Sequence, residues 1–232
     1  MSKIGIILGS GLSHFTKQLE NPEIIYSELG GIHKKSVLEG RICGKTVFLF
    51  TGRNHFYETY SKDKVYRNIN LAKDLNIEFL IITNAAGGLN PLYQVSDLML
   101  IKSHINFFQK RLIEKPVQCS SDGTIRWAKD CAIRNGIKVY EGCYYASSGP
   151  VYETQSEINF LKRVKADAVG MSTIPDILRA NELGIKTLGI SCITNKLYSG
   201  FSVKVTHDEV VDAGAKAYRR FSEYLKNLIN DY

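Results

Sequence analysis

The chain has 232 residues, of which 44% are hydrophobic and 23% are charged, and its formal net charge is +7 at pH 7. This balance is ordinary for a soluble globular protein, and the length suits one large α/β domain, which we place at residues 1–232. No apolar run approaches the roughly 20 residues that a membrane-spanning helix needs. Lysines and arginines are spread along the chain, which favours a solvated basic surface over nucleic-acid binding.

Cysteine usage points to a reducing compartment. The five cysteines are odd in number and scattered, and no two of them form a CxxC pair, so the sequence suggests neither a disulfide framework nor a zinc site. The chain shows no signal-peptide pattern, and we expect it in the cytoplasm. The cysteines are Cys43, Cys119, Cys131, Cys143 and Cys192.

Short apolar segments recur along the chain, and each ends abruptly in small, polar or basic residues. Runs of this length are typical of buried strands. If the strands are parallel, their carboxyl ends meet at one edge of a sheet, where α/β proteins bind ligands. The predicted strands are residues 4–8, 47–50, 79–82, 166–169 and 187–190.

Helical segments lie between these strands, so the chain reads as βαβ units around a mainly parallel sheet. Pro175 in a first turn and Gly184 after a last turn agree with helix ends at those places. Residues 109–123 show little periodicity, and we expect a surface loop there. The predicted helices are residues 62–75, 155–164, 174–183 and 207–229.

The most informative segment is the run Ile-Thr-Asn-Ala-Ala-Gly-Gly-Leu-Asn at residues 82–90. It follows a predicted buried strand and consists largely of small residues. Ala85 and Ala86 have no side chain that would keep a small anion from the backbone, and Gly87 and Gly88 permit dihedrals that other residues avoid. We expect a loop that exposes N–H donors at the end of the strand.

Arg53, His55 and Tyr57 form a second candidate site. In an extended segment, alternate residues project to one side, so the three side chains would face one space. A guanidinium group offers a forked set of donors that suits phosphate, and an imidazole adds another donor. A surface salt-bridge cluster explains the same triplet equally well.

Other polar residues at the predicted strand ends each allow two interpretations. Ser10, between two glycines, either forms a tight turn or offers its hydroxyl to an anion. Ser172 caps a helix or binds an anion at the helix start. Glu153 caps a helix or points its carboxylate into a pocket. Asn195 follows a buried strand, and its amide both donates and accepts, as the edge of a heterocycle requires.

Six motifs together resemble those of the trimeric purine nucleoside phosphorylases, in the same order and across most of the chain. Each is weak alone, whereas the joint match is highly specific. The motifs are GSGL at residues 9–12, GRNHFYE at 52–58, TNAAGGLN at 83–90, GPVYET at 149–154, VGMSTIPD at 169–176 and ITNK at 193–196.

The resemblance implies a phosphorylase/hydrolase-like α/β fold, with a mixed central sheet and a distorted barrel flanked by helices. It implies reversible phosphorolysis of 6-oxopurine ribonucleosides and deoxyribonucleosides, such as inosine and guanosine, to free base and (deoxy)ribose 1-phosphate in purine salvage. Inorganic phosphate would be the co-substrate, with no metal or organic cofactor. The partners would be the nucleoside, phosphate and two further copies of the chain in a homotrimer.

The resemblance also assigns roles by motif position. Asn195, Glu153 and His55 would carry the chemistry. The groups implied to bind phosphate are Ser10, His33, Arg53, His55, the backbone N–H of Ala85 and Ser172. The residues implied to contact the nucleoside are Tyr57, Tyr152, Glu153, Val169, Met171, Asn195 and His207. As lone histidines, His33 and His207 would otherwise be surface or structural residues.

The chain departs from the family pattern in three places. It is short at residues 105–125, where relatives carry an aromatic that closes the neighbouring subunit's pocket, and Asp176 stands where relatives often have Glu. The loop at residues 196–200 differs between relatives and bears on the choice of base. These departures keep alternatives open: a related phosphorylase that prefers xanthosine or a 5′-modified nucleoside, or a non-catalytic nucleoside-binding protein.

Overall fold

A computed structural model describes residues 3–28, 35–59, 61–106, 118–197 and 207–232; within the last range, the side chains of residues 207–216 are not described. The strands are β1 (Ile4–Leu8), β2 (Glu20–Glu28), β3 (Lys35–Ile42), β4 (Lys45–Thr51), β5 (Phe79–Gly88), β6 (Leu98–Asn106), β7 (Val139–Ala146), β8 (Ala168–Gly170) and β9 (Lys186–Lys196). The helices are η1 (Ser13–Gln18), α1 (Phe56–Thr59), α2 (Lys62–Val65), α3 (Arg67–Asp74), α4 (Asp122–Arg134), α5 (Gln155–Arg163), α6 (Ile174–Glu182) and α7 (His207–Asp231).

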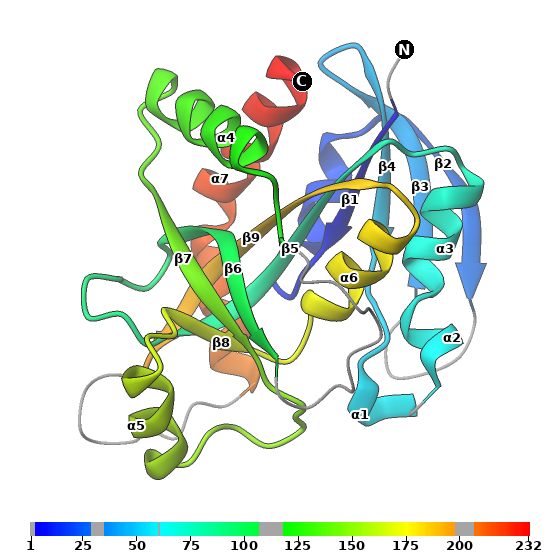
Figure 1. Cartoon of the computed structure of the whole chain (residues 1–232). Helices are drawn as coiled ribbons and strands as arrows, with labels where there is room; N and C mark the ends of the chain where they lie inside the picture. The colour runs from blue at the N-terminus through cyan, green and yellow to red at the C-terminus, as the bar shows by residue number, and fades with distance from the viewer. Residues whose placement is uncertain (1–2, 29–34, 60, 107–117, 198–206) are drawn as a thin grey trace.

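The strands form one nine-stranded mixed sheet in the order β2-β3-β4-β1-β5-β8-β7-β6-β9, and an additional pairing joins β5 to β9. That pairing closes strands β5, β8, β7, β6 and β9 into a barrel, whereas β2, β3, β4 and β1 extend from it as an open sheet (Figure 1). The expected mixed sheet with a distorted barrel is therefore confirmed. The expectation of a mainly parallel sheet is only half right, because β2, β3 and β4 form an antiparallel meander.

Helices cover the sheet on both faces, with α4 and α7 on one side and α3 and α6 on the other (Figure 1). Alternate side chains of a strand point to opposite faces, so neighbouring residues of β1 enter different cores. Ile6 packs in the cluster that includes α4 and α7, and Ile7 packs in the cluster that includes α3 and α6. None of the helices in the described ranges is long and apolar enough to cross a membrane.

Three predicted helices agree with α5, α6 and α7 to within two residues at each end. The predicted helix 62–75 is instead broken in two at Tyr66, which ends α2 and begins α3. Its apolar face is as predicted, with Val65, Ile69 and Ala72 buried. The expected loop 109–123 lies partly outside the described residues, and its last two residues already belong to α4.

Strand β5 pairs with two different strands along one of its edges. Its first half pairs with β1 as far as Ile82, and its last two residues, Gly87 and Gly88, pair with β8. β9 runs along the other edge for the whole length of β5. The residues 83–86 therefore lie in a gap between β1 and β8. β8 runs antiparallel to β5, contrary to the expected parallel arrangement, and its carboxyl end points back toward this gap.

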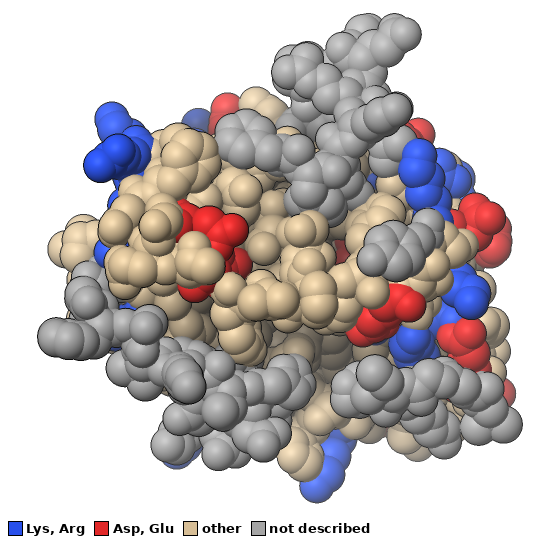
Figure 2. All heavy atoms as spheres, turned by 90° about the horizontal axis from the view of Figure 1, so that it is seen from below, with Lys and Arg blue, Asp and Glu red and all other residues tan. Residues whose placement is uncertain are grey.

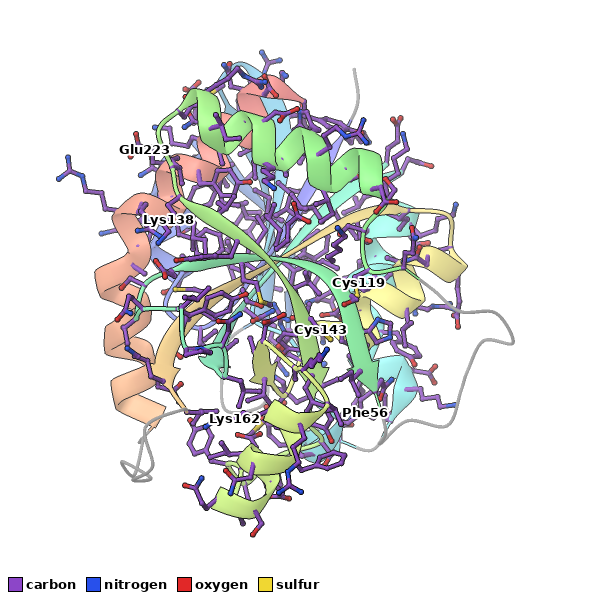
Figure 3. The ribbon with its side chains drawn as sticks, turned by 60° about the vertical axis from the view of Figure 1, so that its left-hand side comes forward. Phe56, Cys119, Lys138, Cys143, Lys162 and Glu223 are labelled. Carbon is purple, nitrogen blue, oxygen red and sulfur yellow. The ribbon has the colours of Figure 1, made fainter. Side chains whose placement is uncertain are left out.

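The segment 83–88 is part of strand β5, so the expected loop at this place is wrong. β9 continues alongside it, which gives the small residues an extended strand to pair with. In Figure 3, Cys143 marks β7 of the barrel near the middle of the molecule, whereas Phe56 of α1 and Lys162 of α5 mark two sides of its lower end. The strand ends that carry the sequence motifs lie at this end.

Packing inside the barrel depends on a glycine of β7. A Cβ atom at Gly142 would lie 2.4 Å from Sδ of Met99 and 2.7 Å from the hydroxyl of Tyr93. We therefore expect Gly142→Ala to lower the free energy of unfolding by about 1–3 kcal/mol, because the surrounding side chains must move. The measurement is denaturant unfolding followed by circular dichroism.

The matched control is Gly123→Ala in α4, where the nearest atom to an added Cβ is Oγ of Ser121 at 3.9 Å. This substitution should leave stability unchanged or raise it slightly, because alanine favours the helix. Equal effects of the two substitutions would contradict the packing argument.

Candidate functional site

A single cavity of about 940 Å³ lies where the motif-bearing strand ends meet, and its volume is that of a small-molecule site. Figure 2 looks onto this lower end, where much of the described surface is uncharged and acidic side chains show at separate places. The sequence-predicted residues that line the cavity are Ser10, Arg53, His55, Tyr57, Ala85, Tyr152, Glu153, Val169, Met171, Ser172 and Asn195.

Two predicted residues cannot be placed in the same way. His33 lies outside the described residues. His207 begins α7, but its side chain lies outside the description. The remaining predicted residues come from six separate stretches of the sequence, and the fold brings all of them to one cavity.

Ser10 lies in a tight turn, as one interpretation of this residue expected, and the turn also lines the cavity. The turn is closed by the N–H of Leu12 donating to the carbonyl of Gly9, and Gly11 has a φ of 83°. Gly9 is required here because a Cβ atom would lie 2.7 Å from Cα of Asn84. The N–H of Gly9 donates to the hydroxyl of Thr83, which ties the end of β1 to β5.

Arg53, His55 and Tyr57 share the cavity, but not for the expected reason. Residues 52–55 follow β4 without regular structure, and α1 begins at Phe56, so no strand alternation aligns them. His55 and Tyr57 stack instead, with ring centroids 5.0 Å apart and planes 10° apart. The surface-cluster interpretation fails for Arg53, which is only 8% exposed.

The guanidinium of Arg53 is held from three directions. One nitrogen, Nη2, donates to the carbonyl of Thr83 at 2.5 Å. The other, Nη1, donates to the hydroxyl of Thr173 at 3.2 Å and lies 3.5 Å from the carboxylate of Asp176. Thr83 belongs to the gap in the β5 edge, so the unpaired strand edge supplies an acceptor for the arginine. The charged side chain is thereby fixed with little freedom.

Thr173 has an unusual backbone conformation beside this cluster. Its φ is 77° and its ψ is −53°, and the N–H of Ile174 donates to the carbonyl of Ser172 across it, which makes a γ-turn. This conformation is strained for a β-branched residue. The hydroxyl of Thr173 accepts hydrogen bonds from both Arg53 and Asn84. These bonds hold the turn in place.

Ser172 does not cap α6, because Thr173 occupies the cap position, so the capping interpretation of Ser172 is wrong. Its hydroxyl lies 3.3 Å from that of Thr173 and lines the cavity. Glu153 is likewise not a cap. Thr154 caps α5 through a capping box with Glu157, which leaves the carboxylate of Glu153 free to face the cavity.

His55 is oriented by Glu58, whose carboxylate lies 2.9 Å from Nδ1 of the imidazole. A carboxylate only accepts, so Nδ1 carries a proton and Nε2 is the nitrogen left for a ligand. Burial lowers the pKa of His55, against the opposing effect of Glu58, and the charges of Arg53 and Lys35 lower it further. The imidazole is therefore mostly neutral at pH 7.

Another part of the cavity lining consists of Glu153, Asn195 and aromatic side chains. Burial raises the pKa of the Glu153 carboxyl, which a hydrogen bond from Ser147 partly offsets. Asn195 lies near the end of β9, with the hydroxyl of Thr194 3.2 Å from its Oδ1. Tyr152 is 43% exposed and lines the cavity near its mouth. This part is suited to a flat polar ring.

Several supporting residues were not singled out as site residues from the sequence. Thr83 and Thr173 bind the arginine, Glu58 orients the histidine, and Asp176 was placed outside the immediate site although it is ion-paired with Arg53. The only signal for them was their position inside the motifs, since the contacts join residues up to 123 positions apart.

Asp176 generates a prediction about pH. Burial raises the pKa of its carboxyl from 3.8 to about 6, although Arg53 opposes the shift. Between these values the folded protein keeps a proton that the unfolded chain has lost, so the wild-type protein loses stability as the pH rises. Asp176→Asn removes this titration. The free energy of unfolding of the wild type minus that of the variant should fall by about 2–3 kcal/mol between pH 4 and pH 6.

Denaturant titrations at intervals of about half a pH unit would measure this difference, because titrations elsewhere in the chain cancel. A difference that stays constant, or that rises with pH, would contradict the assignment.

Comparison with known proteins identifies the family. Residues 3–230 match the family described as the phosphorylase superfamily. Purine nucleoside phosphorylase 1 of Geobacillus stearothermophilus is 36% identical over 249 residues, covering 99% of this chain and 91% of that enzyme. The purine nucleoside phosphorylase of Rattus norvegicus is 32% identical, covering 98% and 88%.

A solved structure agrees with these relatives. The Schistosoma mansoni purine nucleoside phosphorylase in complex with inosine superposes with a TM-score of 0.88 at 29% identity, covering 99% of this chain and 90% of that one. The cavity, the motifs that line it and the near-complete coverage of these enzymes lead to one conclusion: the chain belongs to the purine nucleoside phosphorylase family, a family of pentosyltransferases.

Proposed function

We propose that the protein catalyses the reversible phosphorolysis of 6-oxopurine ribonucleosides and deoxyribonucleosides, such as inosine and guanosine, to the free base and (deoxy)ribose 1-phosphate. The observation that carries the proposal is one cavity lined by two chemically different sets of side chains. Arg53 and Ser172 form a set suited to phosphate, and Glu153 and Asn195 form a set suited to a purine. Arg53 binds the carbonyl of Thr83, whereas Asn195 pairs with Gly87, four residues further along β5. A nucleoside lying between them would present its glycosidic bond to a bound phosphate.

The phosphate would bind among Ser10, Arg53, His55, the backbone N–H of Ala85 and Ser172. Arg53 supplies the full positive charge, and the serine hydroxyls supply neutral donors. The neutral imidazole of His55 would accept a hydrogen bond at Nε2 from a protonated phosphate oxygen, because Glu58 holds its other nitrogen. His33 would complete this set.

The purine would bind with its Watson–Crick edge toward Glu153. An ionised carboxylate only accepts hydrogen bonds. A 6-oxopurine presents an N–H at position 1, whereas adenine presents a bare acceptor nitrogen there, so Glu153 favours hypoxanthine and guanine. Asn195 would contact N7 and the 6-oxygen, with Tyr152, Val169 and Met171 along the ring and the sugar. Tyr57 and His207 would contact the ribose.

The proposed chemistry needs only these groups and phosphate. Breaking the glycosidic bond builds positive charge on the ribose, as in glycoside cleavage. Bound phosphate stabilises that charge and attacks the anomeric carbon, while the bonding electrons leave with the purine. Asn195 would stabilise the negative charge that develops at N7, an interaction that strengthens in the transition state. We propose no metal or organic cofactor.

The ligands of solved relatives support this proposal. Schistosoma mansoni purine nucleoside phosphorylase has been crystallised with inosine, and a schistosome enzyme with guanosine. A second isoform has been crystallised with cytosine and ribose 1-phosphate, which is the proposed product of the sugar half.

The domain organisation, the oligomeric state, the cellular location and the metabolic role are also proposals. We propose one domain over residues 1–232, a homotrimer and a cytoplasmic role in purine salvage, without nucleic-acid or membrane binding. Light scattering with size-exclusion chromatography would test the trimer.

The deciding experiment follows nucleoside cleavage by ultraviolet absorbance, with and without phosphate. Inosine should be cleaved only when phosphate is present, and adenosine much more slowly. Cleavage of xanthosine or a 5′-modified nucleoside in place of inosine would favour the related phosphorylases. No cleavage by the folded protein would favour a nucleoside-binding protein.

Asn195→Ala should lower kcat for inosine by roughly 10²–10³-fold with a smaller change in KM, because the amide acts mainly on the transition state. Steady-state kinetics at saturating phosphate measure both constants. Asn230→Ala, at an exposed position on α7, is the control. A change in KM alone would refute the role of Asn195.

Arg53→Ala should weaken the binding of phosphate rather than that of the nucleoside. Losing a charged donor should raise KM for phosphate by roughly 10- to 100-fold, while KM for inosine changes little. Initial rates measured while phosphate is varied at saturating inosine test this. An unchanged phosphate KM would rule out Arg53 as a phosphate ligand.

A further inference from the structure

A nearly buried lysine lies beside the part of the cavity that is lined by Arg53, His55 and Ser172. We call this part the phosphate end, and none of the roles above uses the lysine. Lys35 is the first residue of β3 and is 8% exposed. Its ammonium group donates to Oδ1 of Asn54, which stands between Arg53 and His55 in the chain. The side-chain N–H of Asn54 in turn donates to the carbonyl of Lys64 at 2.8 Å. The amine lies close enough to His55 for its charge to lower the pKa of that imidazole.

Lys35 differs from the other basic groups of this end in its partners. Within the described ranges, Arg53 is ion-paired with Asp176, and His55 contacts Glu58, but no carboxylate pairs with Lys35. Placing an unpaired ammonium group out of water is costly. A site built this way gains stability when an anion arrives, because the anion supplies the missing partner.

The charges at this end explain why a second cation is needed. His55 is mostly neutral at pH 7, so the described charges are the two cations Arg53 and Lys35 and the two carboxylates Asp176 and Glu58. Without Lys35, a single arginine would face two negative groups, and the site would repel a dianion. The effect acts at short range and in a poorly hydrated place, where charges are weakly screened.

The surface does not supply this charge in place of Lys35. Figure 2 shows that, on the lower end of the molecule, the visible lysine and arginine side chains lie toward the margins of the described surface. The two cations nearest the site are both almost buried. Anion binding therefore depends on fixed interior charges.

We propose that Lys35 is the second cation of the phosphate subsite and sets its affinity for inorganic phosphate and for the phosphate group of ribose 1-phosphate. Lys35 is not among the residues that line the cavity, so it acts through its charge and by holding Asn54, which stands between Arg53 and His55 in the chain. It is a positioning residue rather than a catalytic one. The inference rests on the proposed function for its substrate, but phosphate binding can be measured without turnover.

The test compares three variants with the wild type. Lys35→Met removes the charge and keeps much of the side-chain volume, and Lys35→Arg keeps the charge. The matched control is Lys186→Met, which makes the same change of net charge at an exposed position. Lys186 begins β9, about 30 Å along the strand from the end that carries Asn195.

Two readouts are needed. Isothermal titration with inorganic phosphate gives the dissociation constant of the free protein, and kinetics give KM for phosphate and for inosine. Lys35→Met should raise the phosphate dissociation constant and KM by roughly tenfold and leave KM for inosine within about twofold. Lys35→Arg should recover most of the affinity, and Lys186→Met should match the wild type.

Asn54→Ala covers the case in which a Lys35 variant fails to fold. It removes the amide link but keeps the charge, so it should weaken phosphate binding less than about threefold. An unchanged phosphate affinity in folded Lys35→Met overturns the proposal. So does an equal rise of both KM values with a lower unfolding temperature, because that pattern indicates a purely structural lysine.

The outcomes also separate this inference from the proposed function. If the wild type binds phosphate through Lys35 but cleaves no nucleoside, the proposed reaction fails and the subsite stands. If the enzyme cleaves inosine and Lys35→Met retains its phosphate affinity, the reaction stands and the role of Lys35 fails.

Discussion

The site depends on the pairing of one strand, β5. A strand has two edges, and β9 occupies one of them completely, so β1 and β8 must share the other. They leave residues 83–86 between them, and the cavity opens beside this gap. Backbone groups at a strand edge need partners. The carbonyl of Thr83 finds one in the guanidinium of Arg53, so the chain topology itself creates an anchor for a charged side chain that lines the cavity.

The same constraint explains the composition of β5. Small side chains at Ala85 and Ala86 leave the backbone of this segment accessible from the cavity. Gly87 is confined by Leu197, because an added Cβ would lie 2.7 Å from its Cδ1. Elsewhere in the strand, residues such as Ile81 and Ile82 are fully buried between the two cores. Strand β5 therefore changes from buried core residues to cavity-lining residues within a few positions.

The surroundings of Arg53 concentrate features that cost stability elsewhere in proteins. Arg53 and Asp176 are charged and buried, Lys35 is nearly buried without a carboxylate partner in the described structure, and Thr173 has a strained backbone. Strain of this kind typically costs about 1–3 kcal/mol and persists where the surroundings hold it. Here two hydrogen bonds hold Thr173. Groups fixed in this way need little reorganisation when a charged ligand binds.

The strands β1, β4, β5, β8 and β9 and most of the helices followed from local pattern, because the spacing of apolar residues along the chain is a local property. The strands β2, β3, β6 and β7 were not predicted. The exceptions have tertiary causes. Residues 83–88 contain two glycines, which local propensity disfavours in a strand, but β9 supplies a pairing partner. The break at Tyr66 and the helix α4 were not anticipated from sequence periodicity. The parallel expectation failed at β8 because barrel closure reverses its direction relative to β5.

The sequence by itself determined the family, through six ordered motifs, and nominated the residues that line the cavity. It also determined which residue types stand at the strand ends, since those are read directly. Only the tertiary structure decided how they act. It showed that Thr154 and Thr173 take the cap positions in place of Glu153 and Ser172, that Asp176 is ion-paired with Arg53, and that Lys35 donates to Asn54. The physical reason is that partners, burial and pairing edges are set by contacts between segments far apart in the chain.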